Sequence, residues 1–344
     1  MEKIASKDPS TQANYKISLD NLENFCMQKY GMVDFISELQ TGTEDEVFDF
    51  LQSWINSNSK LSARTVKGYF SGVKKYLHYR GIKLHDEDIK AELDFRRVIE
   101  EELYPLSLED IQAIFNAIHY KAKVTLMCQM SALMRVGETV QLRKKHLILN
   151  KENIIVKLPA SITKFKKGRT TFFSKEASRL LRPKLRDMKD NDLVFGTSPN
   201  VIMSEMNVEQ TLRRILTKIG LDMRYESTGR FMINTHSFRA YGITKISRHD
   251  PNFAKKLAGQ KGYLLQYDRM TDEEKLEVFE SLEVDLIIDN TLKQKAEIKK
   301  LTLDQDRIKA LEVELATIRN NPDIQQTVRA LKKKMKALEA MIED

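Results

Sequence analysis

The 344-residue chain is long enough to hold two domains, each with its own core. Its 57 lysines and arginines outnumber the 49 aspartates and glutamates, which gives a net charge of +8. The two cysteines, Cys26 and Cys128, show neither metal-ligand spacing nor a disulfide framework, and no run of about 18 apolar residues occurs. We therefore expect a soluble protein of the reducing cytoplasm that has no membrane partner.

Residues 1–95 are predicted to form a helical domain. Ser10–Thr11 is the expected cap of a helix that ends at Gly31. Ser62 is the expected cap of a second helix that ends at Gly81, because its apolar residues recur at spacings of three and four. The opposite face of this second helix is basic, so the domain has one face suited to DNA.

Two stretches of the chain are strongly basic. Residues 60–84 contain seven lysines or arginines and no acidic residue, and residues 164–189 contain ten basic residues against two acidic ones. Such stretches suit nucleic acid, because each neutralised phosphate releases counterions, although a solvated lysine-rich face is the commoner reason for a single run. We expect double-stranded DNA as the partner, and the candidate DNA-binding residues are Arg64, Lys67, Lys74, Lys75, Lys166, Lys167 and Arg169.

An acidic connector over 84–105 leads to a mixed α+β domain over 104–288. Ser107 and Asp110 form a capping-box pattern at the start of its first helix. A β-hairpin is expected from runs at 154–158 and 170–173, with Gly168 in its turn. Helices are predicted over about 107–120, 122–133, 136–145, 174–187, 207–219, 236–248 and 271–283.

The tail, residues 291–344, has coiled-coil patterning. Residues that are apolar except for Asp304 step by three and four on both sides of a break at Asn320–Pro322: Leu301, Asp304, Ile308, Leu311, Leu315 and Ile318 before it, and Val328, Leu331, Met335, Leu338 and Ile342 after it. The tail either folds back as a hairpin or pairs between chains. The predicted fold is therefore mainly α with a small β-hairpin, in three parts.

Four motifs in a fixed order carry the chemistry. Arg135 lies in SALMRVGE, Lys164 in TKFKKGR, His236 and Arg239 in NTHSFRAYG, and Tyr267 in LAGQKGYLLQYDRM. Arginine binds phosphate with a planar, permanently charged fork, and a tyrosine can attack the phosphorus. Each motif alone is weak, since such pairs and lysines are common on protein surfaces, but their joint order is specific.

This order resembles the tyrosine recombinase family, the phage-integrase type, over residues from about 10 to 285. The resemblance implies a metal-free transesterification without any cofactor, in which Tyr267 attacks the scissile phosphate and forms a 3′-phosphotyrosyl link. Arg135 and Arg239 would stabilise the transition state, and Glu138 would orient the site. Lys164 would protonate the leaving oxygen, and His236 would handle the tyrosine proton.

One position departs from the family pattern. The family usually has a histidine or tryptophan after a glycine-containing turn, whereas Gln260 follows Gly259 here. Either Gln260 is a weaker, uncharged donor or Lys261 takes its place. Tyr263 competes with Tyr267 as the nucleophile, and the family separation favours Tyr267.

The resemblance favours a site-specific recombinase or integrase, and the tail favours a homo-oligomer, a tetramer on synapsed DNA. Residues 262–286 resemble the branch found in archaeal viruses and mobile elements, which points to viral genome integration. Two alternatives stay open: a type IB topoisomerase, which uses the same chemistry to relax DNA, and a non-catalytic DNA-binding protein with a decayed site.

Overall fold

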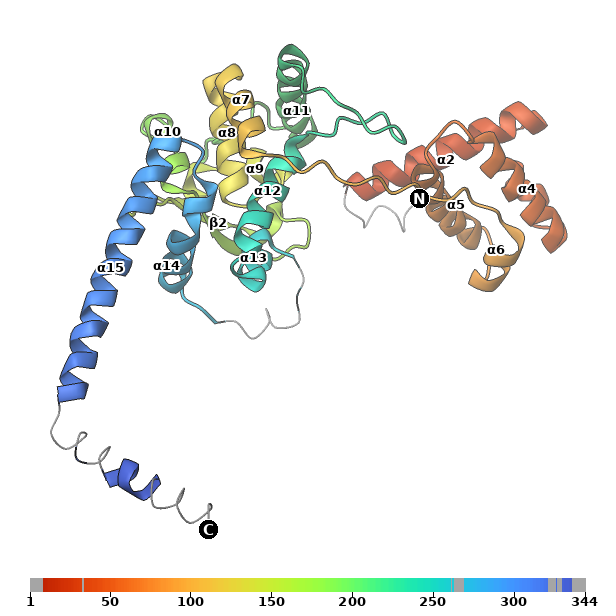
Figure 1. The fold of residues 1–344 in the computed structure, drawn as a ribbon. Helices are drawn as coiled ribbons and strands as arrows, with labels where there is room; N and C mark the ends of the chain where they lie inside the picture. The colour runs from red at the N-terminus through yellow and green to blue at the C-terminus, as the bar shows by residue number, and fades with distance from the viewer. Residues whose placement is uncertain are drawn as a thin grey trace, which may run out of the picture. The chain divides into compact units, whose positions relative to one another are not determined.

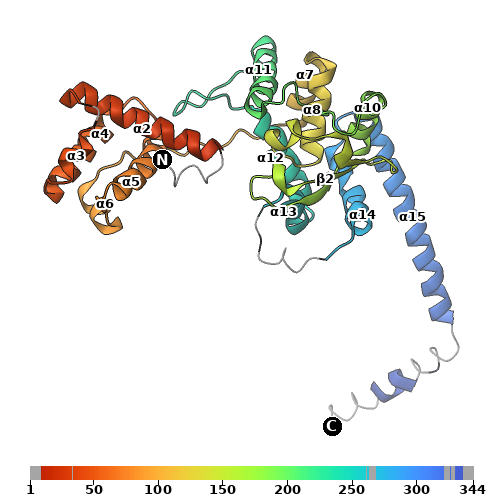
Figure 2. The same ribbon diagram turned by 180° about the vertical axis from the view of Figure 1, so that it is seen from behind.

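The computed structural model describes residues 9–32, 34–260, 262, 269–320, 326 and 330–335. The chain divides into two compact units (Figures 1 and 2). The first contains Met1–Leu103 with Arg224–Met232, and the second contains Tyr104–Met223 with Ile233–Asp344. Within the described ranges, no helix has both the length and the apolar character needed to cross a bilayer.

The first unit is helical. Its buried core includes Trp54, which is fully buried and donates a hydrogen bond of 2.9 Å to Asn21. Helix α2 packs against both α4 and α5. The helices are α2 (Pro9–Tyr30), α3 (Ile36–Leu39), α4 (Glu44–Ser57), α5 (Ala63–Tyr79) and α6 (Asp86–Glu92).

The helix ends of this unit test the predicted caps. The Ser62 side chain accepts a hydrogen bond from the Thr65 amide and caps α5, as predicted. Gly31 and Gly81 adopt left-handed φ angles of 73° and 92° just after α2 and α5, so both predicted ends are confirmed. The predicted cap at Ser10–Thr11 is wrong, because α2 already includes these residues.

Three helices of this unit were not expected: the short α3, and α4 and α6. Helix α4 begins after Thr43, which forms a capping box with Glu46, a pattern that was present in the sequence. Helix α6 lies in the stretch that was expected to be a connector. Leu93, just after α6, is only 5 % exposed and belongs to the core of the first unit, so burial rather than composition decides the structure there.

The second unit contains the mixed part of the fold. The expected capping box of Ser107 and Asp110 is present, with both hydrogen bonds at 3.0 Å. The helix predicted over 136–145 ends at Val140, and a short 3₁₀ helix follows at Lys144–His146. The helices are α7 (Leu108–Ala117), α8 (Tyr120–Ser131), α9 (Val136–Val140), α10 (Lys175–Leu185), α11 (Val201–Ile219), α12 (Thr235–Ser247), α13 (Pro251–Ala258), α14 (Asp272–Leu282) and α15 (Asn290–Asn320).

A three-stranded antiparallel sheet of order β1-β2-β3 lies among these helices. It consists of β1 (Leu147–Ile148), β2 (Ile155–Leu158) and β3 (Arg169–Phe172), and Leu158 pairs with Arg169 at the end of the β2–β3 hairpin. The predicted hairpin is therefore confirmed, whereas β1 was not expected. A mainly α fold with a small antiparallel sheet is what the sequence predicted.

The packing of α12 onto α8 positions the residues of the site. Gly242 of α12 lies so close to α8 that a Cβ added to it would be 2.4 Å from the carbonyl oxygen of Met130. Helix α13 packs against both α12 and β3, and Figures 1 and 2 both show α13 beside α12. These contacts bring α8, α12, α13 and the hairpin together.

Candidate active site

The carboxylate of Glu138 is the centre of the candidate site. Glu138 lies in α9 and is 2 % exposed. It accepts hydrogen bonds from the backbone amide and the guanidinium of Arg135, at 2.9 and 3.1 Å. A buried carboxylate is costly unless it is paired, and here the pairing orients Arg135. The predicted orienting role of Glu138 therefore has a geometric basis.

Arg169 is the second partner of Glu138. Its Nη1 and Nη2 atoms donate to the two carboxylate oxygens at 3.1 and 2.7 Å, and its Nε donates to the carbonyl oxygen of Leu257 at 2.7 Å. The side chain is only 9 % exposed. Arg169 was predicted from the sequence to bind DNA, but its guanidinium is engaged inside the protein and links β3 to α9 and α13.

Gly259 makes room for this arginine. Its φ angle is 63°, and a Cβ at this position would lie 2.9 Å from a guanidinium nitrogen of Arg169. Glycine is therefore needed twice, for the left-handed end of α13 and for the approach of Arg169.

Arg239, in α12, completes the arginine cluster. It is 1 % exposed, and its Nη1 lies 4.0 Å from Glu138. Its guanidinium donates to the carbonyl oxygens of Leu133 and, at 2.8 Å, of Ala258. Burial, followed by the positive charge of Arg135, lowers the pKa of Arg239 to about 10. Arg239 thus stays protonated at neutral pH.

The carbonyl of Leu133 is presented by an unusual backbone conformation. Leu133 has a φ angle of 51°, which a residue with a Cβ rarely adopts. It follows α8 directly, and the strain is located next to Arg135 and Arg239. No local pattern in the sequence predicts this conformation of Leu133.

His236 lies one helical turn before Arg239 in α12, as the H-x-x-R spacing predicted. Although His236 is exposed, the packing around its ring, followed by the positive charges of Arg239 and Arg135, lowers its pKa. The ring is therefore neutral at pH 7 and can accept a proton.

Lys164 lies in the turn between β2 and β3 and is exposed. The neighbouring Phe165 ring lies 5.6 Å from the Arg135 guanidinium, so this turn reaches the arginine cluster. Thr163 organises the turn by accepting from the Lys167 amide at 3.0 Å and donating to the Lys167 carbonyl at 2.9 Å. Gly168 lies in this turn, as predicted, and the left-handed residue of the turn is Lys166, at φ 52°.

Gln260 is exposed just after α13, next to Gly259. Its backbone N–H donates to the carbonyl oxygen of Lys255 at 2.9 Å. Tyr267, the predicted nucleophile, lies outside the described residues, and so do Tyr263 and Lys261.

The predicted DNA-binding residues of α5 lie on the surface of the first unit. Arg64 pairs with Glu100 at 3.5 Å and Lys74 with Asp86 at 2.5 Å, while Lys75 lies 5.0 Å above the Tyr15 ring. Lys67 lies 5.9 Å above the ring of Phe95. Exposed pairs of this kind are weak, so a phosphate can replace the carboxylate.

The second basic stretch is not one continuous surface. Lys175 lies 3.6 Å from Glu283, Arg182 donates to the carbonyl oxygen of Leu149 at 3.0 Å, and Lys184 donates to a backbone carbonyl as well. These cations hold the fold together. Within the hairpin turn, Lys164, Lys166 and Lys167 are exposed.

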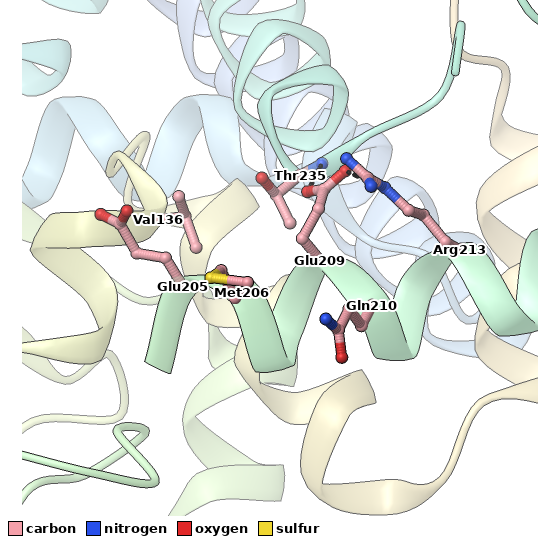
Figure 3. Close-up of a pocket in the computed structure, with 7 residues that line it drawn as sticks. All are labelled: Val136, Glu205, Met206, Glu209, Gln210, Arg213 and Thr235. Carbon is pink, nitrogen blue, oxygen red and sulfur yellow. Dashed lines mark hydrogen bonds and ion pairs between the residues drawn. The ribbon is translucent and has the colours of Figure 1, made fainter. Parts of the chain in front are cut away.

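A cavity of about 270 Å³ lies beside the start of α12 (Figure 3). Glu209 accepts from the Thr235 amide at 3.2 Å and pairs with Arg213 at 3.4 Å, so it holds the start of the helix that carries His236. Burial raises the pKa of Glu205. Carboxylates in the wall make the cavity unsuitable for a phosphate. It is lined by Val136, Glu205, Met206, Glu209, Gln210, Arg213 and Thr235.

The arrangement can bind and polarise a phosphodiester. Three arginines surround one carboxylate, which leaves an excess of positive charge beside a neutral histidine. No group of three or more His, Cys, Asp or Glu side chains among the described residues is placed to hold a metal ion.

The part of the chain that contains this site matches a known protein family. Residues 104–259 match the model of the phage integrase family. The match includes Arg135, Lys164, His236 and Arg239 and ends before Tyr267. No curated protein matches the chain in sequence.

Solved structures with a similar fold include three protein–DNA complexes. The integrase of the Tn1549 transposon with transposon right end DNA is 15 % identical, with 80 % of this chain and 95 % of that chain covered at a TM-score of 0.54. A lambda integrase dimer on a COC′ core site is 13 % identical, with 78 % and 94 % covered at 0.52. The XerH recombinase on palindromic difH is 17 % identical, with 77 % and 78 % covered at 0.51. These likenesses support the fold.

Proposed function

We propose that this protein is a site-specific DNA recombinase or integrase that cleaves and rejoins DNA through a 3′-phosphotyrosyl intermediate. The observation that carries the proposal is the cluster of Arg135, Arg169 and Arg239 around the buried Glu138, inside the stretch that matches the phage integrase family. A preorganised positive site of this kind stabilises negative charge that develops on a phosphate.

In the proposed reaction the phenolic oxygen of Tyr267 attacks the scissile phosphorus. The bond between phosphorus and the 5′ oxygen breaks, and the tyrosine is then linked to the 3′ phosphate. His236 takes the proton of the phenol, and Lys164 gives a proton to the departing 5′ oxygen. Attack by the freed 5′ hydroxyl of another strand reverses these steps and rejoins the DNA, so no external energy source is required.

The two arginines have different tasks. Arg135 is partly exposed, at 27 % of its side chain, and is therefore available to a non-bridging phosphate oxygen. Arg239 is almost fully buried. Its charge adds to the positive potential at the site, and its hydrogen bonds to the carbonyl oxygens of Leu133 and Ala258 hold it in place. Gln260 or Lys261 supplies the further donor that the family places after the glycine turn.

DNA is the proposed substrate, and several protomers act together, as a tetramer on two synapsed sites. An origin in an archaeal virus or mobile element, integration of a viral genome and a cytoplasmic location belong to the same proposal. They rest on the sequence alone.

The decisive experiment traps the covalent intermediate on a nicked suicide substrate that carries the recognition site. The native protein should form a denaturant-resistant adduct with the 3′ end of the cleaved strand. Tyr267→Phe should abolish the adduct and spare DNA binding, because only one hydroxyl is lost. The matched change Tyr263→Phe should leave the adduct in place.

Other outcomes would point elsewhere. If Tyr263→Phe abolishes the adduct and Tyr267→Phe does not, then Tyr263 is the nucleophile. An absence of any adduct would favour a DNA-binding protein with a decayed site. Relaxation of any plasmid without site preference, and without joining of two sites, would favour a topoisomerase.

A further inference from the structure

The surface of α15 carries an apolar seam that the described part of the chain does not cover. Its positions recur at spacings of three and four, with Asp304 between Leu301 and Ile308, and each apolar member is between 46 and 64 % exposed: Leu301, Ile308, Leu311, Leu315 and Ile318. Leu331 and Met335, which follow in the sequence, are themselves 56 and 60 % exposed. Because burial of apolar surface is worth about 25 cal/mol per Å², the seam favours a partner.

We propose that this partner is α15 of a second copy of the chain, in a parallel, in-register coiled coil over residues 301–319. With Leu301 at heptad position a, Arg307 and Glu314 fall at position g, and Glu312 and Arg319 at position e. In a parallel pair, position g of one helix faces position e of the next heptad of the other helix. Arg307 then faces Glu312 of the second copy, and Glu314 faces its Arg319.

The pattern of charges favours the parallel arrangement. Both pairs of opposite charge form on each side of a parallel coiled coil. A fully overlapping antiparallel pair aligns g with g and e with e, so Arg307 faces Glu314 but Glu312 faces the uncharged Gln305. The parallel pair therefore gives Glu312 an oppositely charged residue on the other helix, which the antiparallel pair does not.

One residue of the seam keeps the association weak. Asp304 occupies a d position, and in register it meets Asp304 of the second copy. A polar residue in the seam fixes the register but lowers stability. If the proposed function is correct, two protomers on neighbouring DNA sites raise the effective concentration of this helix, so that a weak coiled coil forms on DNA.

Sedimentation of the full-length protein without DNA tests the seam independently of catalysis. Asp304→Leu should lower the dissociation constant of self-association by at least about tenfold, which is about 1.4 kcal/mol. Asp306 lies at position f, on the opposite face of the helix. Asp306→Leu is therefore the matched control and should leave the constant within about twofold. Equal effects of the two changes would overturn the proposal.

Charge exchange tests the identity of the partner. The double variant Arg307→Glu, Arg319→Glu makes all four flanking positions acidic, and Glu312→Lys, Glu314→Lys makes them all basic. Each variant alone should associate at least about tenfold more weakly, while a mixture of the two should recover association, because every pair is then attractive. A mixture that associates no better than either variant would rule out pairing between copies.

Cysteine cross-linking tests the orientation. The natural cysteines, Cys26 and Cys128, are buried and do not compete. In a parallel pair, Leu301→Cys and Ile318→Cys should each form a disulfide-linked dimer alone. Cross-linking only in a mixture of these two variants would show an antiparallel pair and overturn the proposed arrangement.

Discussion

Glu138 holds the candidate site together with one buried carboxylate. Burial alone would raise its pKa, but the hydrogen bonds and charge of Arg169, together with those of Arg135, outweigh it and lower the pKa. A carboxylate with a lowered pKa contributes stability above its ordinary pKa of about 4.3. This stability is lost as the pH falls through the folded-state pKa, so the site should weaken in acid.

Among the residues of the candidate site, Arg169 is the one whose loss should lower the free energy of unfolding most. Arg169→Met leaves Glu138 buried with one close cationic partner, so we expect the free energy of unfolding to fall by about 3–5 kcal/mol. Urea unfolding followed by circular dichroism measures this change. The control is Lys167→Met in the turn just before β3; Lys167 is exposed, so this change should alter stability by less than about 0.5 kcal/mol. If Arg169→Met has normal stability but binds DNA more weakly, then Arg169 contacts DNA, as the sequence predicted.

His236 should set the acid limit of cleavage. Because its pKa is lowered, the neutral ring persists to a pH below the ordinary value of about 6.5, and protonation below that point removes the base. The rate constant of adduct formation should therefore fall with an inflection below pH 6.5. His236→Gln should slow the reaction and remove this inflection.

A second histidine serves as the control for this profile. His249 is exposed and bonds to Asp285 at 2.6 Å, away from the arginine cluster. His249→Gln should keep both the rate and the acid inflection. An unchanged profile in His236→Gln would show that another group accepts the proton.

At the scale of elements, α5 is expected to carry much of the DNA affinity of the first unit. Changing Lys67, Lys74 and Lys75 to Glu should weaken binding to a duplex site. The magnitude of the slope of log K against log salt should fall by about 2.7, because each of three lost phosphate contacts contributes about 0.9. Fluorescence anisotropy at several salt concentrations measures both effects.

The control for α5 reverses the same number of charges elsewhere in the first unit. Lys16, Lys29 and Lys90 are exposed on α2 and α6, and changing them to Glu alters the net charge equally. This control should keep most of the salt slope. If the two triple variants lose affinity equally, the effect is one of net charge and α5 is not the contact.

At the scale of the whole molecule, the tail should be separable from the chemistry. The start of α15 is anchored, since Gln112 donates to Ile288 at 2.8 Å and Glu176 accepts from the amides of Ile288 and Asp289. Removing residues 297–344 keeps this anchor. Adduct formation on a single site should stay within about twofold. Joining of two sites should fall at least about tenfold, because the protomers on the two sites are no longer held together through α15.

A single-site assay beside a two-site assay checks this prediction. Thermal unfolding of the shortened protein controls for damage to the fold. Loss of cleavage in a shortened protein that remains folded would mean that the tail takes part in the chemistry.

The sequence alone determined the elements whose signals are local. Ser62, Gly31 and Gly81 set helix ends through their own hydrogen bonds or φ angles, and the β2–β3 hairpin follows from its runs of β-branched and aromatic residues. The order of the motifs placed Arg135, Lys164, His236 and Arg239 in one region of the chain. This was possible because binding a phosphate requires particular residue types, and the motifs that carry them follow one another in a fixed order along the chain.

Only the tertiary structure decided how these residues are held. Arg169 and Glu138 are 31 positions apart, and nothing local distinguishes Arg169 from the exposed lysines beside it. Its guanidinium is directed inward because α9, α13 and β3 meet there, and because Gly259 leaves room for it. The strained Leu133 and the connector residue Leu93 have the same origin: burial among elements that are distant in sequence outweighs local preference.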